Sequence, residues 1–225
     1  MLEEILPQEV VSQECFGEPR PGGLFPAEEA AVANAVDRRR REYATVRRCA
    51  RACLRSLGYD EQPILAGVDG APSWPAGVRG SMTHCEGYAA AAVVAARHAC
   101  TIGIDAEPDA PLPDGVVDLV ATPLERDRLS AMPGGPAEPC WDRLLFSAKE
   151  VVFKAWSPVV GEWLDAEDTE ILFDPTADTF TATVSSERRA RADRLVTSFD
   201  GRWTRAGGIL VTAVVVGQRP GRRSR

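Results

Sequence analysis

The stretch Trp141-Asp-Arg-Leu-Leu-Phe-Ser-Ala-Lys-Glu-Val-Val-Phe-Lys-Ala-Trp156 predicts a long central helix. Apolar side chains cover most of its surface, and a helix that is apolar nearly all round is expected to be buried. At about 100° per residue, Ser147, Glu150 and Lys154 fall on one narrow stripe. A Glu–Lys pair one turn apart is usually a surface feature. Here the apolar surroundings favour a functional role, because buried charges need partners.

The segments on both sides of this helix predict strands and further helices. Apolar residues at helical spacing indicate a helix over about residues 28–57, which follows an irregular arm rich in proline and glycine at residues 1–26. One helical stretch is expected near residues 114–131. The predicted strands are Thr101–Asp105 and residues 170–173, 179–184 and 209–216.

Each half of the chain therefore consists of a helix followed by strands. The predicted class is α+β, with helices packed against antiparallel strands. We place the boundary after residue 108, which gives an N-terminal lobe at residues 1–108 and a C-terminal lobe at residues 109–225. The sequence holds no repeat strong enough to prove a duplication.

The composition excludes several classes of protein. Of 225 residues, 44% are hydrophobic and 26% are charged, which is typical of a globular protein and not of a disordered or fibrous one. A net charge of −7 argues against general nucleic-acid binding. The absence of a long apolar run argues against a membrane span. The acidic start, Met1–Glu4, and six cysteines without a Cys-x-x-Cys pair favour a reduced, cytoplasmic protein without a zinc site.

Two carboxylates follow the strand Thr101–Asp105. Asp105 and Glu107 are two residues apart, so in an extended chain they point the same way, and Pro108 ends the strand. Carboxylates at this spacing suit Mg²⁺, although a solvated acidic turn would have the same sequence. Glu150 would then be a third oxygen ligand or a general base, and Lys154 would contact phosphate.

The helix expected at residues 28–57 is rich in arginine. A charge run is usually a solvated face, but Arg39 occupies a position on the apolar stripe, and Arg47 and Arg51 flank that stripe one turn apart. Arginines that face a protein interior need phosphate or carboxylate partners. The outer arginines could attract an acidic partner.

The segment Gly80-Ser-Met-Thr-His-Cys85 is expected to form a loop that lets backbone and hydroxyl groups approach an anion, with the imidazole of His84 as a donor. A lone histidine is more often structural, and we give His98 that role. The sequence contains neither of the glycine-rich fingerprints of nucleotide-binding folds.

Together these stretches resemble a 4′-phosphopantetheinyl transferase of the siderophore and secondary-metabolite type, the group associated with surfactin and enterobactin synthetases, including its actinobacterial members. The resemblance covers roughly residues 36–216. It rests on residues 39–51, on residues 74–88 with Thr83-His84, on Gly103-Ile-Asp-Ala-Glu-Pro108, and on Phe146-Ser-Ala-Lys-Glu-x-x-x-Lys154 some forty residues later.

The resemblance implies an Mg²⁺-dependent enzyme, with Mn²⁺ left open. It would transfer phosphopantetheine from its substrate coenzyme A to a serine of an apo carrier protein and release 3′,5′-ADP. Two similar α+β lobes related by pseudo-twofold symmetry would hold the active site between them. The metal ligands would be Asp105, Glu107 and Glu150. Asp105, Glu150 and Lys154 would be catalytic, with Glu150, directly or through a water, as the base for the serine.

The resemblance also assigns the coenzyme site. Thr83 and His84 would touch the coenzyme's phosphates, and Lys149 and Lys154 its pyrophosphate. Beside them, Asp105 and Glu150 would approach the same group, and Arg39, Arg47 and Arg51 would hold the 3′-phosphoadenosine end. Relatives carry a cation near residues 66–71, which this chain lacks, and Arg79 is a candidate replacement.

The expected partners are acidic acyl or peptidyl carrier proteins or domains, and one chain with two lobes favours a monomer. The sequence does not separate fatty-acid, polyketide, nonribosomal-peptide and siderophore carriers. The alternatives are a Mg²⁺-dependent pyrophosphohydrolase of coenzyme A or nucleotides, which would use water as its nucleophile, and a regulatory module that binds coenzyme A without turning it over.

Overall fold

Two antiparallel sheets form the framework of the protein in this computed structural model, which describes residues 1–19, 21–67, 70–185, 187–188 and 197–218. The helices are α1 (Leu2–Ile5), α2 (Pro26–Ala31), α3 (Asp37–Ser56), α4 (Val116–Val120), α5 (Pro123–Ser130) and α6 (Trp141–Val160), with a 3-10 turn η2 at Ala166–Asp168. The strands are β1 (Val11–Phe16), β2 (Val78–Cys85), β3 (Tyr88–Ala95), β4 (Ala99–Pro108), β5 (Thr169–Asp174), β6 (Thr179–Val184), β7 (Ser198–Ala206) and β8 (Ile209–Gly217). The predicted α+β class is confirmed.

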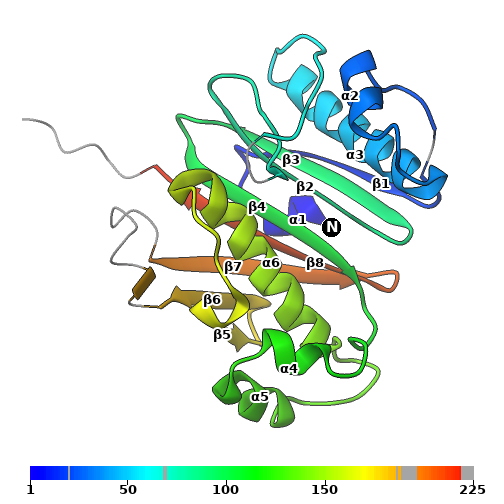
Figure 1. Cartoon of the computed structure of the whole chain (residues 1–225). Helices are drawn as coiled ribbons and strands as arrows, with labels where there is room; N and C mark the ends of the chain where they lie inside the picture. The colour runs from blue at the N-terminus through cyan, green and yellow to red at the C-terminus, as the bar shows by residue number, and fades with distance from the viewer. Residues whose placement is uncertain (20, 68–69, 186, 189–196, 219–225) are drawn as a thin grey trace, which may run out of the picture.

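The strand order divides the molecule into two parts. The first sheet has the order β1-β3-β2, and the second has the order β4-β8-β7-β6-β5. In Figure 1 the first sheet lies in the upper part beside α2 and α3, and α6 crosses the second sheet in the lower part. No helix in the described part of the chain is long and apolar enough to cross a bilayer.

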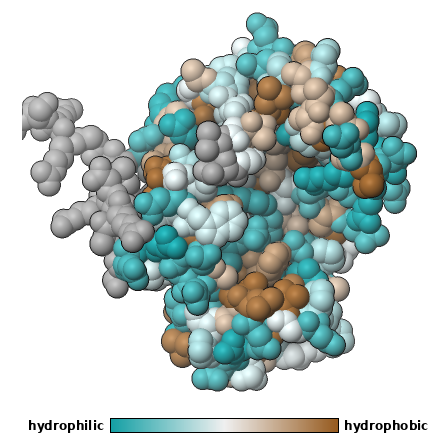
Figure 2. Space-filling model, in the orientation of Figure 1, coloured by the Kyte–Doolittle hydropathy of each residue, from teal (hydrophilic) through white to brown (hydrophobic). Residues whose placement is uncertain are grey.

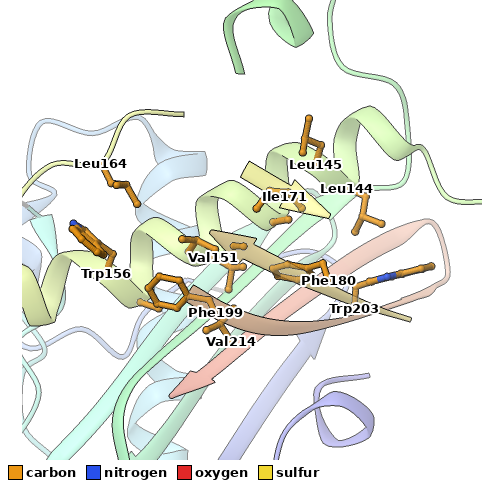
Figure 3. Packing of buried hydrophobic residues seen from close by; sticks show 14 of the residues in the cluster. Leu144, Leu145, Val151, Trp156, Leu164, Ile171, Phe180, Phe199, Trp203 and Val214 are labelled. Carbon is orange, nitrogen blue, oxygen red and sulfur yellow. The ribbon is translucent and has the colours of Figure 1, made fainter. Parts of the chain in front are cut away.

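The core of the lower part forms between α6 and the second sheet. Leu144, Leu145, Val151 and Trp156 of α6 are at most 1% exposed and belong to the same apolar cluster as Phe180, as Figure 3 shows. Burying an aliphatic or aromatic side chain of this size stabilises the folded state by about 1.5–3 kcal/mol. This helix was predicted correctly, and it continues four residues further, through Pro158, to Val160.

The strand β3 is buried on both faces, which explains its unbroken run of small apolar residues. Ala91 and Val93 pack with Cys53 and Leu54 of α3, whereas the alternate residues pack into a cluster with β4 and β8. The seven residues from Tyr88 to Val94 are all buried.

The two sheets meet along β2 and β4 through side chains. The Ile104 N–H donates to the Ser81 hydroxyl at 3.1 Å, and the Ala106 N–H donates to the Thr83 hydroxyl at 3.0 Å. By backbone pairing β4 belongs to the second sheet, because its residues pair with β8. The lobe boundary after residue 108 stays a prediction, and this strand joins the two parts.

Four predicted elements were wrong in detail. The arm at residues 1–26 contains α1 and β1, and the segment Gly80–Cys85 belongs to the strand β2 rather than to a loop. Gly80 serves packing there, since a Cβ would lie 2.6 Å from the Trp74 ring. The helix expected at 28–57 is split into α2 and α3. The helix expected near 114–131 is split into α4 and α5, and Thr122 is the N-cap of α5.

Candidate active site

A cavity of about 520 Å³ opens between α3, β2 and α6 and is also bordered by the segment from Ala66 to Trp74. It brings together six residues that the sequence predicted as ligands or catalytic groups. Arg39 and Arg47 come from α3, Thr83 and His84 from β2, and Glu150 and Lys154 from α6, so both parts of the molecule contribute. Arg79, the candidate replacement for a missing cation, lines the same cavity.

Arg39 and His84 contact one another at the mouth of this cavity. The Arg39 guanidinium donates to Nε2 of His84, and the Glu42 carboxylate lies 3.3 Å from the same nitrogen. An arginine can donate to this nitrogen only when it is unprotonated. Burial and the charge of Arg39 lower the pKa of His84, so the imidazole is neutral at pH 7. The Arg39 side chain is 53% exposed, which leaves it accessible to an anionic ligand.

Arg47 is buried, in contrast to Arg39, and its position is fixed on several sides. Its Nε donates to the Ile64 carbonyl at 2.9 Å, and its guanidinium carbon lies 3.0 Å from the centroid of the Tyr43 ring. Burial lowers the pKa of Arg47 to about 10. It therefore keeps its charge at pH 7 and presents a desolvated cation to the cavity.

Asp105 lies at the centre of the contacts between the two parts. Its carboxylate accepts from Lys154 Nζ at 2.6 Å, from the Ser147 hydroxyl at 2.8 Å and from the Thr83 hydroxyl at 3.2 Å. Residues from β2 and α6 therefore hold one buried carboxylate on β4. Because such charge-assisted hydrogen bonds are among the strong ones, they fix the position of α6 relative to β2.

The other two predicted carboxylates differ in their partners. Glu107 forms an ion pair with Arg143 at 2.9 Å, whereas no hydrogen bond or ion pair reaches Glu150 from any described residue. Burial and the charge of Asp105 raise the pKa of both Glu107 and Glu150. The unpaired carboxylate of Glu150, which lines the cavity, is therefore a stronger base than an exposed glutamate.

These carboxylates fit a divalent cation in their chemistry. Among the described residues, no three His, Cys, Asp or Glu side chains are gathered in the arrangement of a metal site. Hard oxygen donors are nevertheless the ligands that Mg²⁺ prefers. The charge of Asp105 raises the pKa of both neighbours, which is the repulsion that a cation would relieve. At present Lys154 and Arg143 supply the positive charge.

Three predicted coenzyme ligands do not line the cavity: Asp105, Lys149 and Arg51. Asp105 is buried behind Lys154, which does line it. The Lys149 ammonium is buried against Glu125 at 2.8 Å and donates to the Ala166 and Thr169 carbonyls. Arg51 is buried against Glu28 at 2.9 Å. Both cations are neutralised inside the protein, so the structure corrects the expectation that they face the coenzyme. Lys149 lies on α6 and Arg51 on α3, which are the helices that border the cavity, but their side chains do not line it.

Sequence analysis missed two charged residues of the site. Arg143 forms an ion pair with Glu107, and the Glu42 carboxylate lies beside His84. The sequence patterns predicted neither contact. A signal for Arg143 existed, because positions 143, 147, 150 and 154 follow the spacing of one helical face. Glu42 stood in an arginine-rich run and carried no comparable signal.

Comparisons with known proteins match both parts of the chain. Residues 27–94 match the model of the 4′-phosphopantetheinyl transferase N-terminal domain, and residues 101–205 match that of the 4′-phosphopantetheinyl transferase superfamily. The 4′-phosphopantetheinyl transferase Svp of Streptomyces mobaraensis is 48% identical over 219 residues, which cover 96% of this chain and 89% of Svp.

Two further relatives agree with this match. The 4′-phosphopantetheinyl transferase Npt of Nocardia iowensis is 43% identical over 95% of this chain and 99% of its own length. The 4′-phosphopantetheinyl transferase PptT of Mycobacterium tuberculosis is 40% identical over 96% of this chain and 98% of its own length. The chain belongs to the 4′-phosphopantetheinyl transferase family, and its reaction is the transfer of 4′-phosphopantetheine from coenzyme A to a carrier protein.

Proposed function

We propose that the cavity between α3, β2 and α6 binds coenzyme A, and that Asp105, Glu107 and Glu150 hold Mg²⁺ beside its pyrophosphate. The observation that supports this most is that one cavity is lined by the cations Arg39 and Arg47 and, across from them, by Lys154 and the free carboxylate of Glu150. Cations suit the phosphates of the coenzyme, and carboxylates suit the metal ion.

The 3′-phosphoadenosine end is assigned to the α3 side. Arg47 offers a buried charge there, and Arg39 offers a more exposed one beside the neutral imidazole of His84. Arg79 is the candidate for the cation that residues 66–71 lack, since it lines the same cavity. Thr83 contributes indirectly, because its hydroxyl is engaged by Asp105 and by the Ala106 N–H.

The chemistry is assigned to the α6 side. A bound Mg²⁺ would neutralise charge on the pyrophosphate while its phosphoanhydride bond breaks and a phosphodiester to the carrier serine forms. Lys154 stabilises the oxygens of the leaving 3′,5′-ADP, and Glu150 takes the proton of the carrier serine, directly or through a water, as the serine oxygen attacks the β-phosphorus. The raised pKa and the free carboxylate of Glu150 support this role.

The carrier protein is proposed to dock beside Glu150. A second cavity of about 230 Å³ is lined by Glu150 together with the apolar side chains of Val120, Phe146, Phe153 and Trp163. We call these four residues the apolar patch. Figure 2 shows hydrophobic residues gathered over α4 and the neighbouring part of α6. Exposed arginines of α3, among them Arg38, would attract an acidic carrier.

The two lobes are proposed to be related by pseudo-twofold symmetry. In each half, a short helix has proline at its start and a buried glutamate three residues after its N-cap, Glu28 in α2 and Glu125 in α5. Each glutamate binds a cation of the following long helix, Arg51 in α3 or Lys149 in α6. A monomer is proposed because the two lobes lie in one chain, and the free cysteines of the described part accord with the cytoplasm.

The test is the intact mass of apo acyl and peptidyl carriers incubated with the protein, coenzyme A and Mg²⁺, with and without chelator. The proposal expects each carrier to gain the mass of one phosphopantetheine, and chelator to abolish this gain. Adding Mn²⁺ after the chelator tests whether that ion can replace Mg²⁺. Release of 3′,5′-ADP without any carrier would instead support a pyrophosphohydrolase. Transfer that persists in chelator would contradict the role given to Mg²⁺.

A further inference from the structure

The carboxylate of Glu28 on α2 is completely buried and satisfied on both oxygens. Oε1 accepts from Arg51 at 2.9 Å and from the Ile64 N–H at 2.8 Å. Oε2 accepts from Arg51 at 3.0 Å and from the Phe25 N–H at 2.9 Å. The side chain is 0% exposed. Three donor groups thus supply four hydrogen bonds to this carboxylate, and a buried ion pair of this kind is expensive to desolvate unless its geometry is good.

Glu28 joins three segments that are distant in the sequence. It belongs to α2, Arg51 belongs to α3, and Ile64 precedes the segment that borders the coenzyme cavity. The Ser73 N–H donates to the Leu65 carbonyl at 2.8 Å, so the segment returns on itself directly after Ile64. The position of Ile64 therefore determines where this wall of the cavity begins.

The same peptide also positions Arg47. The Ile64 N–H donates to Glu28, and the Ile64 carbonyl accepts from Arg47 Nε at 2.9 Å. Glu28 Oε1 itself lies 3.8 Å from Arg47 Nε. In the described part of the chain the hydrogen bonds of Arg47 use Nε and Nη1 only. The second terminal nitrogen, Nη2, is thus left for a ligand in the cavity that Arg47 lines.

We propose that Glu28 is a positioning residue for coenzyme recognition: through Ile64 it fixes Arg47 and the adjoining cavity wall in the orientation that binds the 3′-phosphate. The inference rests on the proposed function, because it takes Arg47 as the contact to the 3′-phosphoadenosine end. It also gives Arg51 a different part from the one expected, which is to neutralise Glu28 rather than to touch the coenzyme.

The test compares coenzyme A with 3′-dephospho-coenzyme A, which differ only in the phosphate that Arg47 is proposed to bind. KM and kcat are measured for both in wild type, Glu28→Gln and Arg47→Met. An uncharged amide has one accepting oxygen and cannot accept all four hydrogen bonds, so Glu28→Gln should raise KM for coenzyme A by about tenfold, the equivalent of one charge-assisted hydrogen bond. KM for dephospho-coenzyme A and kcat should change less than twofold.

Glu125→Gln is the matched control. Glu125 is also buried, accepts from the Thr122 and Ile171 N–H groups, and binds Lys149. Unlike the partners of Glu28, none of these three residues lines the coenzyme cavity or holds a residue that does. Glu125→Gln should lower the thermal midpoint as Glu28→Gln does. It should leave unchanged the KM ratio, which is KM for dephospho-coenzyme A divided by KM for coenzyme A. A merely structural role for Glu28 predicts that both variants leave this ratio unchanged.

Each failure has its own signature. If Arg47→Met leaves the KM ratio unchanged, the assignment of the 3′-phosphate to Arg47 is wrong. If Arg47→Met lowers the ratio but Glu28→Gln does not, only the role of Glu28 is overturned. Should Glu28→Gln fail to fold, Arg51→Lys decides by the same ratio. It keeps a charge beside Glu28 but removes the planar guanidinium, whose Nη1 contacts both oxygens of Glu28 while Nη2 donates to the Gly23 carbonyl. An unchanged ratio in this variant overturns the proposal.

Discussion

The ammonium group of Lys154 on α6 lies 2.6 Å from the carboxylate of Asp105 on β4. The Lys154 side chain is 27% exposed and lines the cavity, whereas the Asp105 side chain is 6% exposed. The lysine therefore reaches solvent from a pair that is anchored inside the protein. Such an ammonium can meet a phosphate without losing its buried partner, which suits a group that must stabilise a leaving phosphate.

Lys154→Met should lower kcat by about 10²–10³-fold, as the removal of one preorganised donor commonly does. Asp105→Asn should lower it to a comparable degree. Because the two groups form one unit, the double variant should be far less impaired than the product of the single losses predicts. Steady-state transfer to an apo carrier measures all three. Losses that multiply would show that the two residues act independently.

Gly103 allows α6 to approach β4 closely. A Cβ at this position would lie 2.4 Å from the Val151 carbonyl oxygen and 3.1 Å from the Val151 side chain. Gly103→Ala should therefore displace the helix that carries Glu150 and destabilise the fold by about 1–3 kcal/mol. Urea unfolding measures the change. Gly134→Ala is the control, because nothing lies within 4 Å of a Cβ there, and equal stability of the two variants would refute the explanation.

The elements that could be predicted from the sequence carry strong periodic patterns. The helix from Trp141 and the strand ending at Asp105 follow such patterns, and they bring most of the site with them. The strand β7 was missed although Phe199, Gly201 and Trp203 alternate with exposed residues, because polar side chains and a glycine dilute the signal. The edge strand β1 carries no clear pattern of burial.

The orientation of charged residues was less predictable than the elements themselves. A helix that is buried nearly all round has more than one face that meets protein. Periodicity placed Glu150 and Lys154 on one stripe of this helix but could not tell what Lys149, which lies off that stripe, would contact. The structure resolves this through Glu125, which lies far away in the sequence and captures Lys149.

Lys149→Met should affect stability rather than coenzyme binding. The Lys149 and Glu125 side chains are 6% and 1% exposed, and removing one partner of a buried ion pair costs about 3–5 kcal/mol. Urea unfolding should show this loss, while KM for coenzyme A in the folded variant changes less than twofold. Arg128→Met, which removes a more exposed bridge to Glu170, should cost less than about 1 kcal/mol. A selective rise in KM for Lys149→Met would return this lysine to the coenzyme site.

His84 should make the stability of the protein fall in mild acid. Burial and the charges of Arg39 and Lys154 lower the pKa of His84 below its ordinary value of 6.5, against the opposing charges of Glu42 and Asp105. As the pH falls through 6.5, the unfolded chain therefore binds the proton more readily than the folded one, and the free energy of unfolding decreases. His84→Gln keeps an acceptor for Arg39 but does not titrate, so it should lack this decrease.

Urea unfolding of wild type and His84→Gln at several pH values between 7.5 and 5 measures the difference. The stability of wild type relative to the variant should diminish as the pH falls. The opposite trend would show that Glu42 stabilises a charged imidazole in the folded protein, and that Arg39 does not use Nε2 of His84 as an acceptor.

Trp163 offers a test of the carrier-docking surface. Its side chain belongs to the apolar patch, is 63% exposed and lies 4.7 Å from Phe153 between ring centroids. Exposed aromatic side chains beside a pocket are typical anchors of protein interfaces. Trp163→Ala should therefore raise KM for the carrier by about tenfold or more, with KM for coenzyme A unchanged. Leu172→Ala on β5, 56% exposed and outside the apolar patch, is the matched control. If both variants keep the wild-type KM for several carriers, the carrier docks elsewhere on the protein.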